Sequence, residues 1–94
     1  MDRLKIKGYI NIAHKAGYLI FNGEKLEGYS KKLYLVLYDR DAGKNTLKIA
    51  ERLKENYQVL PIDNLEELTS VKNCKIVGIK NKNLSEVIQK LIEE

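Results

Sequence analysis

The segment Asn22-Gly23-Glu24-Lys25 combines residue types that suit contact with an anion. Asparagine is a favoured first residue of a helix, where N–H groups without helical partners and a partial positive charge face outward. Gly23 has no side chain and so lets a ligand approach closely, and Glu24 can accept hydrogen bonds from base amino groups such as that of guanine. Taken alone, these residues fit a capped helix with a solvated polar face and no ligand somewhat better than a binding site.

Residues that could carry catalysis are few. His14 is the only histidine, with no serine or cysteine near it in sequence to form a catalytic pair, and we expect it at the exposed end of a helix. Cys74 is the only cysteine, so the chain has no internal disulfide and no zinc site built from several cysteines. We expect Cys74 to be buried in a strand, as free cysteines commonly are.

Asp39 and Asp41 follow an apolar run that ends at Tyr38, which is a position where α/β proteins place a metal-binding or phosphoryl-accepting carboxylate. Such a receiver needs further acidic residues at the end of the first strand, where this sequence reads IFNG. No glycine-rich loop matches a nucleotide-binding motif. We therefore expect a protein that is not an enzyme and that uses no metal and no cofactor.

Positive charge is concentrated in the first part of the chain. Residues 1–56 carry twelve Lys or Arg against seven Asp or Glu, a net charge of +5, whereas residues 57–94 carry five against six, a net charge of −1. Lys31, Lys32, Arg40 and Lys44 belong to the basic part, and we expect them to neutralise phosphates. The charge distribution is compatible with a polyanionic partner.

The length of 94 residues suits one domain spanning residues 1–94. No apolar run approaches the roughly 20 residues that span a bilayer, and the N-terminus lacks the features of a signal peptide. We expect a cytoplasmic protein without membrane contact.

Apolar periodicity and turn residues predict alternating helices and strands. Gly17 is suited to a left-handed helix cap, and the Asp63–Glu66 and Asn83–Glu86 spacings are typical of capping boxes. The predicted helices cover residues 4–16, 23–32, 44–56, 63–68 and 83–92, and the predicted strands cover residues 18–21, 33–38, 58–62 and 75–79.

Strict alternation of helix and strand predicts an α/β fold, specifically a three-layer α/β/α sandwich with a four-stranded mixed sheet. The short first strand can join this sheet antiparallel, and Pro61 belongs at an edge or a strand end. Loops that follow parallel strands emerge at one edge of a sheet, which brings FNGEK and YDRDAGKN together. The position of the segment LTSVKN depends on the direction of the last strand and stays open.

The stretch IAHKAGYLIFNGEKL, followed by LYLVLYDRDAGKNTLKIAERL, resembles the L-seven-Ae/L-thirty-e superfamily of ribosomal proteins, in its bacterial YlxQ-like branch. The resemblance rests on four dipeptides that occur in the order of the family pattern: Ala16-Gly17, Gly23-Glu24, Asp41-Ala42 and Asn45-Thr46. It covers nearly the whole chain.

This resemblance implies a non-enzymatic, ribosome-associated protein that binds kink-turn-like RNA, with RNA, including ribosomal RNA, and possible ribosomal proteins as partners. On this basis Gly23 and Glu24 fall on the helix start that reads the bend. Asp41 and Ala42 fall on a second loop. The predicted RNA-binding residues from both lines of reasoning are Asn22, Gly23, Glu24, Lys25, Lys31, Lys32, Arg40, Asp41, Ala42, Lys44, Val71 and Lys72.

A protein-interaction adaptor that keeps this fold without kink-turn recognition is the alternative. Tyr18 stands where the family has a basic residue, and residues 68–73 replace a glycine-containing loop. Lysines spread over all faces, together with an exposed apolar patch, would favour the adaptor. An open helix start at residues 22–25 beside Lys31 and Lys32 would favour RNA binding.

Overall fold

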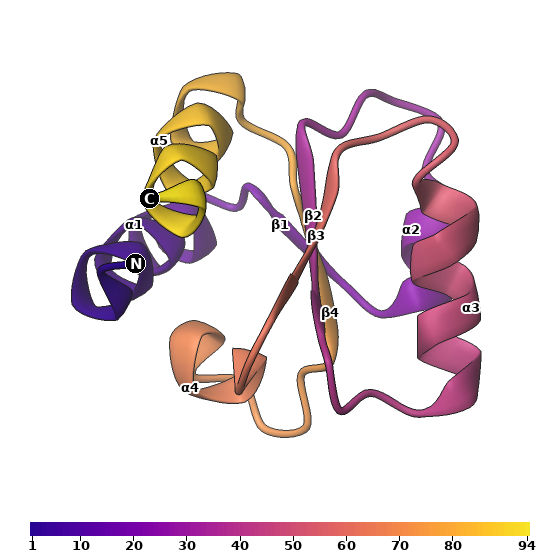
Figure 1. Ribbon diagram of the computed structural model, residues 1–94. Coiled ribbons are helices and arrows are strands. Elements are labelled where there is room, and N and C mark those ends of the chain that lie inside the picture. The colour runs from indigo at the N-terminus through magenta and orange to yellow at the C-terminus, as the bar shows by residue number, and fades with distance from the viewer.

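The computed structural model describes all 94 residues, and helices and strands alternate along the whole chain (Figure 1). The elements are α1 (Arg3–Lys15), β1 (Leu19–Phe21), α2 (Gly23–Glu27), β2 (Leu35–Asp39), α3 (Lys44–Leu53), β3 (Val59–Ile62), α4 (Leu65–Thr69), β4 (Ile76–Ile79) and α5 (Lys82–Glu93). The predicted order of elements is confirmed.

The four strands form one mixed sheet in the order β1-β4-β2-β3. β2 and β3 are parallel, and β4 runs antiparallel to both of its neighbours, β1 and β2. The mixed sheet and the antiparallel pairing of the first strand are therefore confirmed. Pro61 lies on β3, the outer strand, where a residue without an N–H group does least harm to the ladder.

Helices cover both faces of this sheet (Figure 1). α1, α4 and α5 lie over one face, and α2 and α3 lie over the other. Each face has its own apolar core. The first contains Ile6, Ile10, Leu35, Leu37, Ile62, Leu65, Leu68, Cys74, Val77, Ile79 and Ile88. The second contains Leu26, Leu33, Val36, Ala50, Leu53, Val59 and Ile76. The predicted three-layer sandwich is confirmed.

Two helices differ from the prediction at their ends. α2 ends at Glu27 with Gly28 as its cap, five residues before the predicted end at Lys32. Glycine lowers helix propensity by about 1 kcal/mol relative to alanine, and this short helix has little packing to offset that cost. α5 begins at Lys82, because the Asn81 side chain accepts a hydrogen bond from the N–H group of Leu84. The predicted cap at residue 83 is wrong by two residues.

The start of α4 is capped from a distance. Asn64 precedes the helix in a left-handed conformation and makes no side-chain cap. Instead, the Asp39 carboxylate at the end of β2 accepts a hydrogen bond of 3.0 Å from the N–H group of Leu65. The predicted capping role of Asp63 is therefore wrong. A side chain 26 residues away takes that role, which sequence spacing could not reveal.

The strand directions define two edges of the sheet. We call the edge with the ends of β1, β2 and β3 at Phe21, Asp39 and Ile62 the Asp39 edge. We call the opposite edge, where these strands begin at Leu19, Leu35 and Val59, the Tyr34 edge. Because β4 is antiparallel to β2, the segment 70–75 that leads into β4 lies at the Asp39 edge. The segment LTSVKN, whose position the sequence left open, therefore lies beside the loops that follow β1 and β2.

No helix is long and apolar enough to cross a membrane.

Candidate nucleic-acid interface

A groove of about 360 Å³ lies at the Asp39 edge, between the start of α2, the first turns of α3 and the segment that leads into β4. It mixes apolar and polar side chains, with two lysines. Its lining residues are Phe21, Asn22, Gly23, Thr46, Val71, Lys72, Asn73, Cys74, Lys75 and Ile76. The groove therefore joins three loops that are far apart in the sequence.

The start of α2 is less open than the sequence predicts. The Asn22 side chain accepts a hydrogen bond of 2.9 Å from the N–H group of Glu24, and the backbone carbonyl of Asn22 accepts one from the N–H group of Leu26. Gly23 is buried, and a β-carbon at this position would lie 2.7 Å from Cδ1 of Ile49 on α3. The missing side chain of Gly23 is thus explained by packing of α2 on α3. A ligand therefore cannot approach Gly23 from the side that Ile49 fills, although the residue does line the groove.

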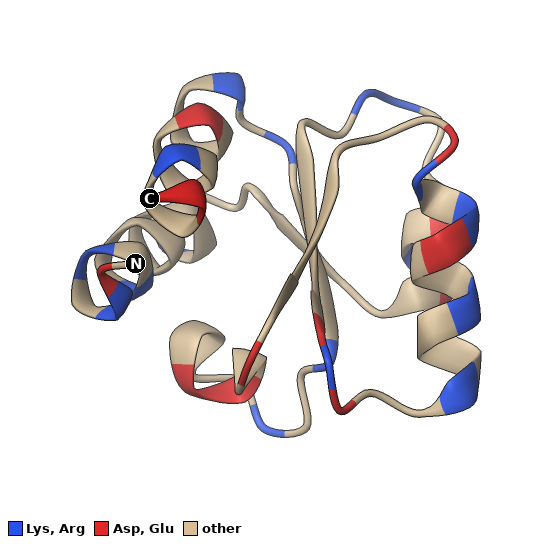
Figure 2. Ribbon diagram, viewed as in Figure 1, with Lys and Arg blue, Asp and Glu red and all other residues tan.

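Lys31 and Lys32 lie far from the start of α2. Because α2 ends at Glu27, both lysines belong to the loop that precedes β2, and β2 begins at the Tyr34 edge. Figure 2 shows this loop at the opposite end of the sheet from the first residue of α2. The expected cluster of residues 22–25 with these two lysines is therefore wrong. Lys25 and Glu24 do lie on the exposed first turn of α2.

Asp39 is a buried structural carboxylate, only 2% exposed. Its oxygens accept hydrogen bonds from the N–H groups of Asp41 and Leu65, and the Lys75 ammonium lies 3.7 Å away. Burial acts to raise the pKa of Asp39, but the hydrogen bonds and Lys75 outweigh it and hold the pKa below its ordinary value. The carboxylate thus ties three loops of this edge together.

The loop after β2 contributes less to the surface than predicted. Ala42 is buried, and its N–H group donates to the carbonyl of Asp39, so its predicted contact with RNA is wrong. The Arg40 guanidinium lies 2.9 Å from the Asp63 carboxylate, which neutralises part of its charge. Asp41 and Lys44 are exposed, and Lys44 is the first residue of α3.

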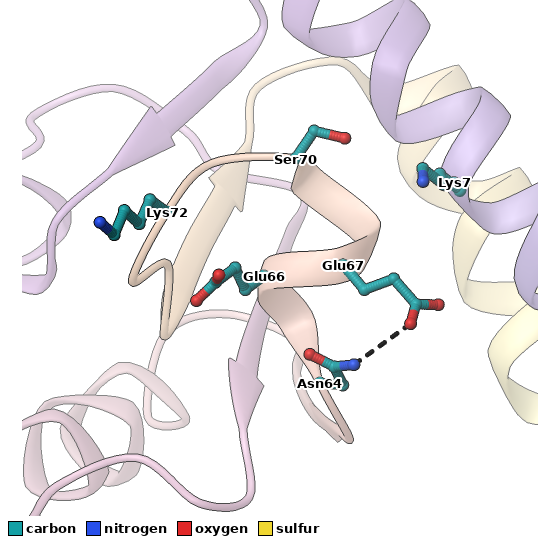
Figure 3. A pocket seen from close by; sticks show the side chains of 6 residues that line it. All are labelled: Lys7, Asn64, Glu66, Glu67, Ser70 and Lys72. Atoms are coloured by element: carbon teal, nitrogen blue, oxygen red, sulfur yellow. Dashed lines mark hydrogen bonds between the residues drawn. The ribbon is translucent and has the colours of Figure 1, made fainter.

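Lys72 lines both the groove and a second hollow, and Figure 3 shows the residues of this second hollow. This hollow, about 460 Å³, has no apolar lining and is formed by Lys7, Asn64, Glu66, Glu67, Ser70 and Lys72. Figure 3 shows the hydrogen bond that the Asn64 amide donates to Glu67. Glu66 accepts another hydrogen bond, from the backbone N–H group of Asn73. Two lysines and two glutamates balance in charge, so the hollow has no preference for an anion.

Four of the predicted residues, Asn22, Gly23, Val71 and Lys72, line the groove together. Sequence reasoning missed Thr46, Asn73 and Lys75. The groove positions of Asn73 and Lys75 follow from the antiparallel direction of β4, which the sequence did not determine. Thr46 belongs to the Asn45-Thr46 pair of the family pattern and could have been found there.

The two single-copy residues occupy structural positions. His14 is exposed near the end of α1, with its ring edge-on to Phe21 at 5.2 Å, so its predicted position is confirmed. Cys74 is buried, as predicted, but lies two residues before β4 rather than in it. Burial raises the pKa of the Cys74 thiol, which makes it a poor nucleophile near neutral pH.

Charge and apolar exposure are spread over the molecule. Lys and Arg residues occur on α1, α3, α5 and both edges of the sheet (Figure 2). Leu4 and Ile12 on the outer side of α1 are 84% and 54% exposed. The presence of basic residues on several elements is the part of the adaptor prediction that these features meet.

No family model and no curated protein matches this chain. A solved structure of a protein with unknown function from Bacillus halodurans C is similar to it, with 22% sequence identity and a TM-score of 0.79. The similarity covers 96% of this chain and 98% of that chain. The α/β sandwich is therefore shared with a natural protein over its full length, and the resemblance to the ribosomal superfamily stays a prediction.

Proposed function

We propose that the protein binds structured RNA without catalysis, as a ribosome-associated protein of the kink-turn-binding type. The groove at the Asp39 edge carries this proposal, because it combines the two features that an unstacked nucleotide needs. Apolar side chains of Phe21, Val71 and Ile76 offer contact to a base, and polar groups surround them. Single-stranded and bent RNA is commonly recognised in this way.

Polar side chains at the rim of the groove can form hydrogen bonds with the base. Asn73 lies beside Val71 in the lining and has an amide side chain without a partner in the chain. An amide donates and accepts at the same time, so it can pair with the edge of a base. Thr46 on α3 adds a hydroxyl on the facing side of the groove.

Three lysines at this edge supply the charge. Lys25, Lys44 and Lys72 have no carboxylate within 4.0 Å, whereas Arg40 is paired with Asp63 and Lys75 with Asp39. Each phosphate that they neutralise is expected to add about 0.9 to the log–log salt slope for duplex RNA, by analogy with B-DNA. The proposed mechanism therefore relies on these three side chains in place of Lys31 and Lys32.

The test compares a hairpin that contains a kink-turn with the same hairpin in which Watson–Crick pairs replace the bend. The wild type is expected to bind the bent hairpin more tightly in a gel-shift titration. Lys72→Gln is expected to weaken that binding roughly fivefold and to reduce the salt slope by about 0.9. Lys90→Gln, at an exposed position on α5, removes the same charge away from the groove and serves as the control.

Equal affinity for the two hairpins, or equal losses of affinity for Lys72→Gln and Lys90→Gln, would contradict recognition by the groove. The adaptor is then the better proposal, since Leu4 and Ile12 on α1 offer exposed apolar contact. An adaptor without RNA binding gives no gel shift with either hairpin at moderate salt.

A further inference from the structure

Five lysines gather at the Tyr34 edge, opposite the groove. They come from the end of α1, the loop before β2 and the turn between β4 and α5, and they are Lys15, Lys31, Lys32, Lys80 and Lys82. Figure 2 shows basic residues in the loop before β2, at the end of β4 and at the start of α5, all at this end of the sheet. None of them has a carboxylate within 4.0 Å.

Few carboxylates oppose this charge. Helices α2 and α3 both end at the Tyr34 edge, but Glu27 is held by the Arg52 guanidinium at 2.6 Å, and Glu51 is held by Lys54. Glu55 and Glu86 are the acidic side chains near this edge that have no ion pair. Five free cations against two free carboxylates make this edge more positive than the Asp39 edge, where Arg40 and Lys75 are paired.

Tyrosines alternate with lysines along the same edge. The N–H group of Lys80 donates to the carbonyl of Tyr18, and the N–H group of Tyr34 donates to the carbonyl of Ile79. Tyr18, Lys80 and Tyr34 therefore form one row across β1, β4 and β2, just beyond the row Leu19–Ile79–Leu35. Adjacent strands lie about 4.8 Å apart, so the two tyrosines are about 10 Å apart with a lysine between them.

Both tyrosine rings are at least partly exposed. Tyr18 is 37% exposed, whereas Tyr34 is half-buried and has the Lys32 ammonium over its ring, 5.3 Å from the ring centre. The start of α5, a helix of twelve residues, faces the same edge next to Lys80 and adds the partial positive charge of its first N–H groups. Cations, aromatic faces and a helix start thus converge on one surface.

We infer that the Tyr34 edge binds single-stranded nucleic acid, with bases stacked on Tyr18 and Tyr34 and phosphates neutralised by the surrounding lysines. Proteins that hold single strands without sequence preference combine these two features, a basic track and aromatic rings that stack with any base. An acidic polypeptide would use the lysines but would leave the tyrosine faces without a role, so the row of rings favours nucleic acid.

This inference goes beyond the proposed function, because it concerns another surface and another form of nucleic acid. The probe is a fluorescein-labelled twelve-nucleotide oligouridylate, which has no stable secondary structure, and the readout is fluorescence anisotropy at several salt concentrations. Tyr34→Ala and Tyr18→Ala are each expected to weaken binding roughly fivefold to a hundredfold. Tyr34→Phe keeps the ring and is expected to retain binding, which separates stacking from the hydroxyl group.

The lysines are tested by Lys31→Gln with Lys32→Gln, which is expected to lower the salt slope by about 1.4, or about 0.7 for each phosphate that is no longer neutralised. Lys48→Gln on α3 with Lys90→Gln on α5 removes the same charge away from this edge and is expected to leave the slope nearly unchanged. Circular dichroism of every variant confirms that it is folded, and Tyr18→Ala, at the more exposed ring, keeps the test valid if Tyr34→Ala is unfolded.

Equal effects of the two double variants would overturn the inference, since binding would then follow net charge. Retention of affinity by folded Tyr18→Ala and Tyr34→Ala would also overturn it. Polyglutamate binding that depends on Lys31 and Lys32, without oligouridylate binding, would replace it by an acidic protein partner. Failure of the groove is separable, because Lys72→Gln affects only the kink-turn hairpin and leaves oligouridylate binding intact.

Discussion

The two edges of the sheet differ in how many of their Lys and Arg side chains are held in ion pairs. At the Asp39 edge, Arg40 is paired with Asp63 and Lys75 lies beside the buried Asp39 carboxylate, so these two cations are used within the protein, and Lys25, Lys44 and Lys72 stay free. At the Tyr34 edge, Lys15, Lys31, Lys32, Lys80 and Lys82 have no ion-pair partners, and Lys80 lies between Tyr18 and Tyr34. The Asp39 edge thus has a groove of about 360 Å³, whereas the main feature of the Tyr34 edge is its unpaired positive charge.

This difference teaches that a count of basic residues does not locate a binding surface. The basic part of the sequence divides between the two edges, because α2 and β2 carry the chain from one edge to the other between Lys25 and Arg40. Shape at the Asp39 edge fits a fixed, bent RNA, whereas free charge and stacking at the Tyr34 edge fit a flexible strand.

The largest effect is expected from Asp39→Asn, which removes interactions at the Asp39 edge and none at the Tyr34 edge. An amide cannot accept from both N–H groups as the carboxylate does and loses the attraction to Lys75, so we expect a decrease of about 2 to 3 kcal/mol in the free energy of unfolding. Thermal denaturation measures this as a fall in Tm of roughly 4 °C or more per kcal/mol. An unchanged Tm would contradict the role given to Asp39.

The pH dependence of the stability of Asp39→Asn tests whether the ionised carboxylate of Asp39 is the source of this stabilisation. The pKa of Asp39 is lowered in the folded protein, so its stabilisation is complete above the unfolded pKa of about 3.9 and is lost as the pH falls through the folded pKa. The difference in stability between wild type and Asp39→Asn is therefore expected to narrow below about pH 4. A difference that stays constant from neutral pH down to about pH 3 would exclude the ionised carboxylate as its source.

Charge reversal compares the edges directly. Lys31→Glu with Lys32→Glu is expected to weaken oligouridylate binding by roughly tenfold or more, because two attractive charges near the phosphates become repulsive, and to change kink-turn hairpin binding much less. Lys25→Glu with Lys72→Glu is expected to do the reverse. Titrations of both RNAs against both variants measure this, and parallel decreases in all four would show that the edges do not act separately.

A small effect is expected from Asp63→Asn, which releases Arg40 from its ion pair. Arg40 and Asp63 are both largely exposed, so the pair contributes little to stability and Tm is expected to change by no more than a few degrees. The freed guanidinium is expected to strengthen hairpin binding about twofold and to raise the salt slope. Weaker hairpin binding would show that Asp63 itself contacts the RNA or holds Arg40 in its productive position.

Much of the fold was predictable from local patterns. The apolar run that ends at Tyr38 predicted a strand over residues 33–38, and the structure has β2 there, at Leu35–Asp39, between β4 and β3. Gly17 has the left-handed conformation, with φ +77°, that its position after α1 predicted. These features depend on neighbours along the chain, which the sequence displays.

The site was less predictable because it depends on contacts between distant segments. The sequence suggested that the missing side chain of Gly23 makes room for a ligand, whereas in the fold Ile49 of α3 fills that space. The direction of β4 brings Asn73 and Lys75 to the groove, and no local pattern fixes that direction. Lys31 and Lys32 were placed by continuing α2 past Gly28, and the early end of that helix moved them to the other edge.

The central claim is that the two edges bind two forms of RNA. Amide chemical-shift mapping on one ¹⁵N-labelled sample, titrated first with oligouridylate and separately with the kink-turn hairpin, tests it most directly. The account predicts that oligouridylate shifts the amides of Tyr18, Tyr34 and Lys80, and that the hairpin shifts those of Asn22, Lys72 and Asn73. Shifts from both RNAs on the same edge, or none at the Tyr34 edge with oligouridylate, would contradict it.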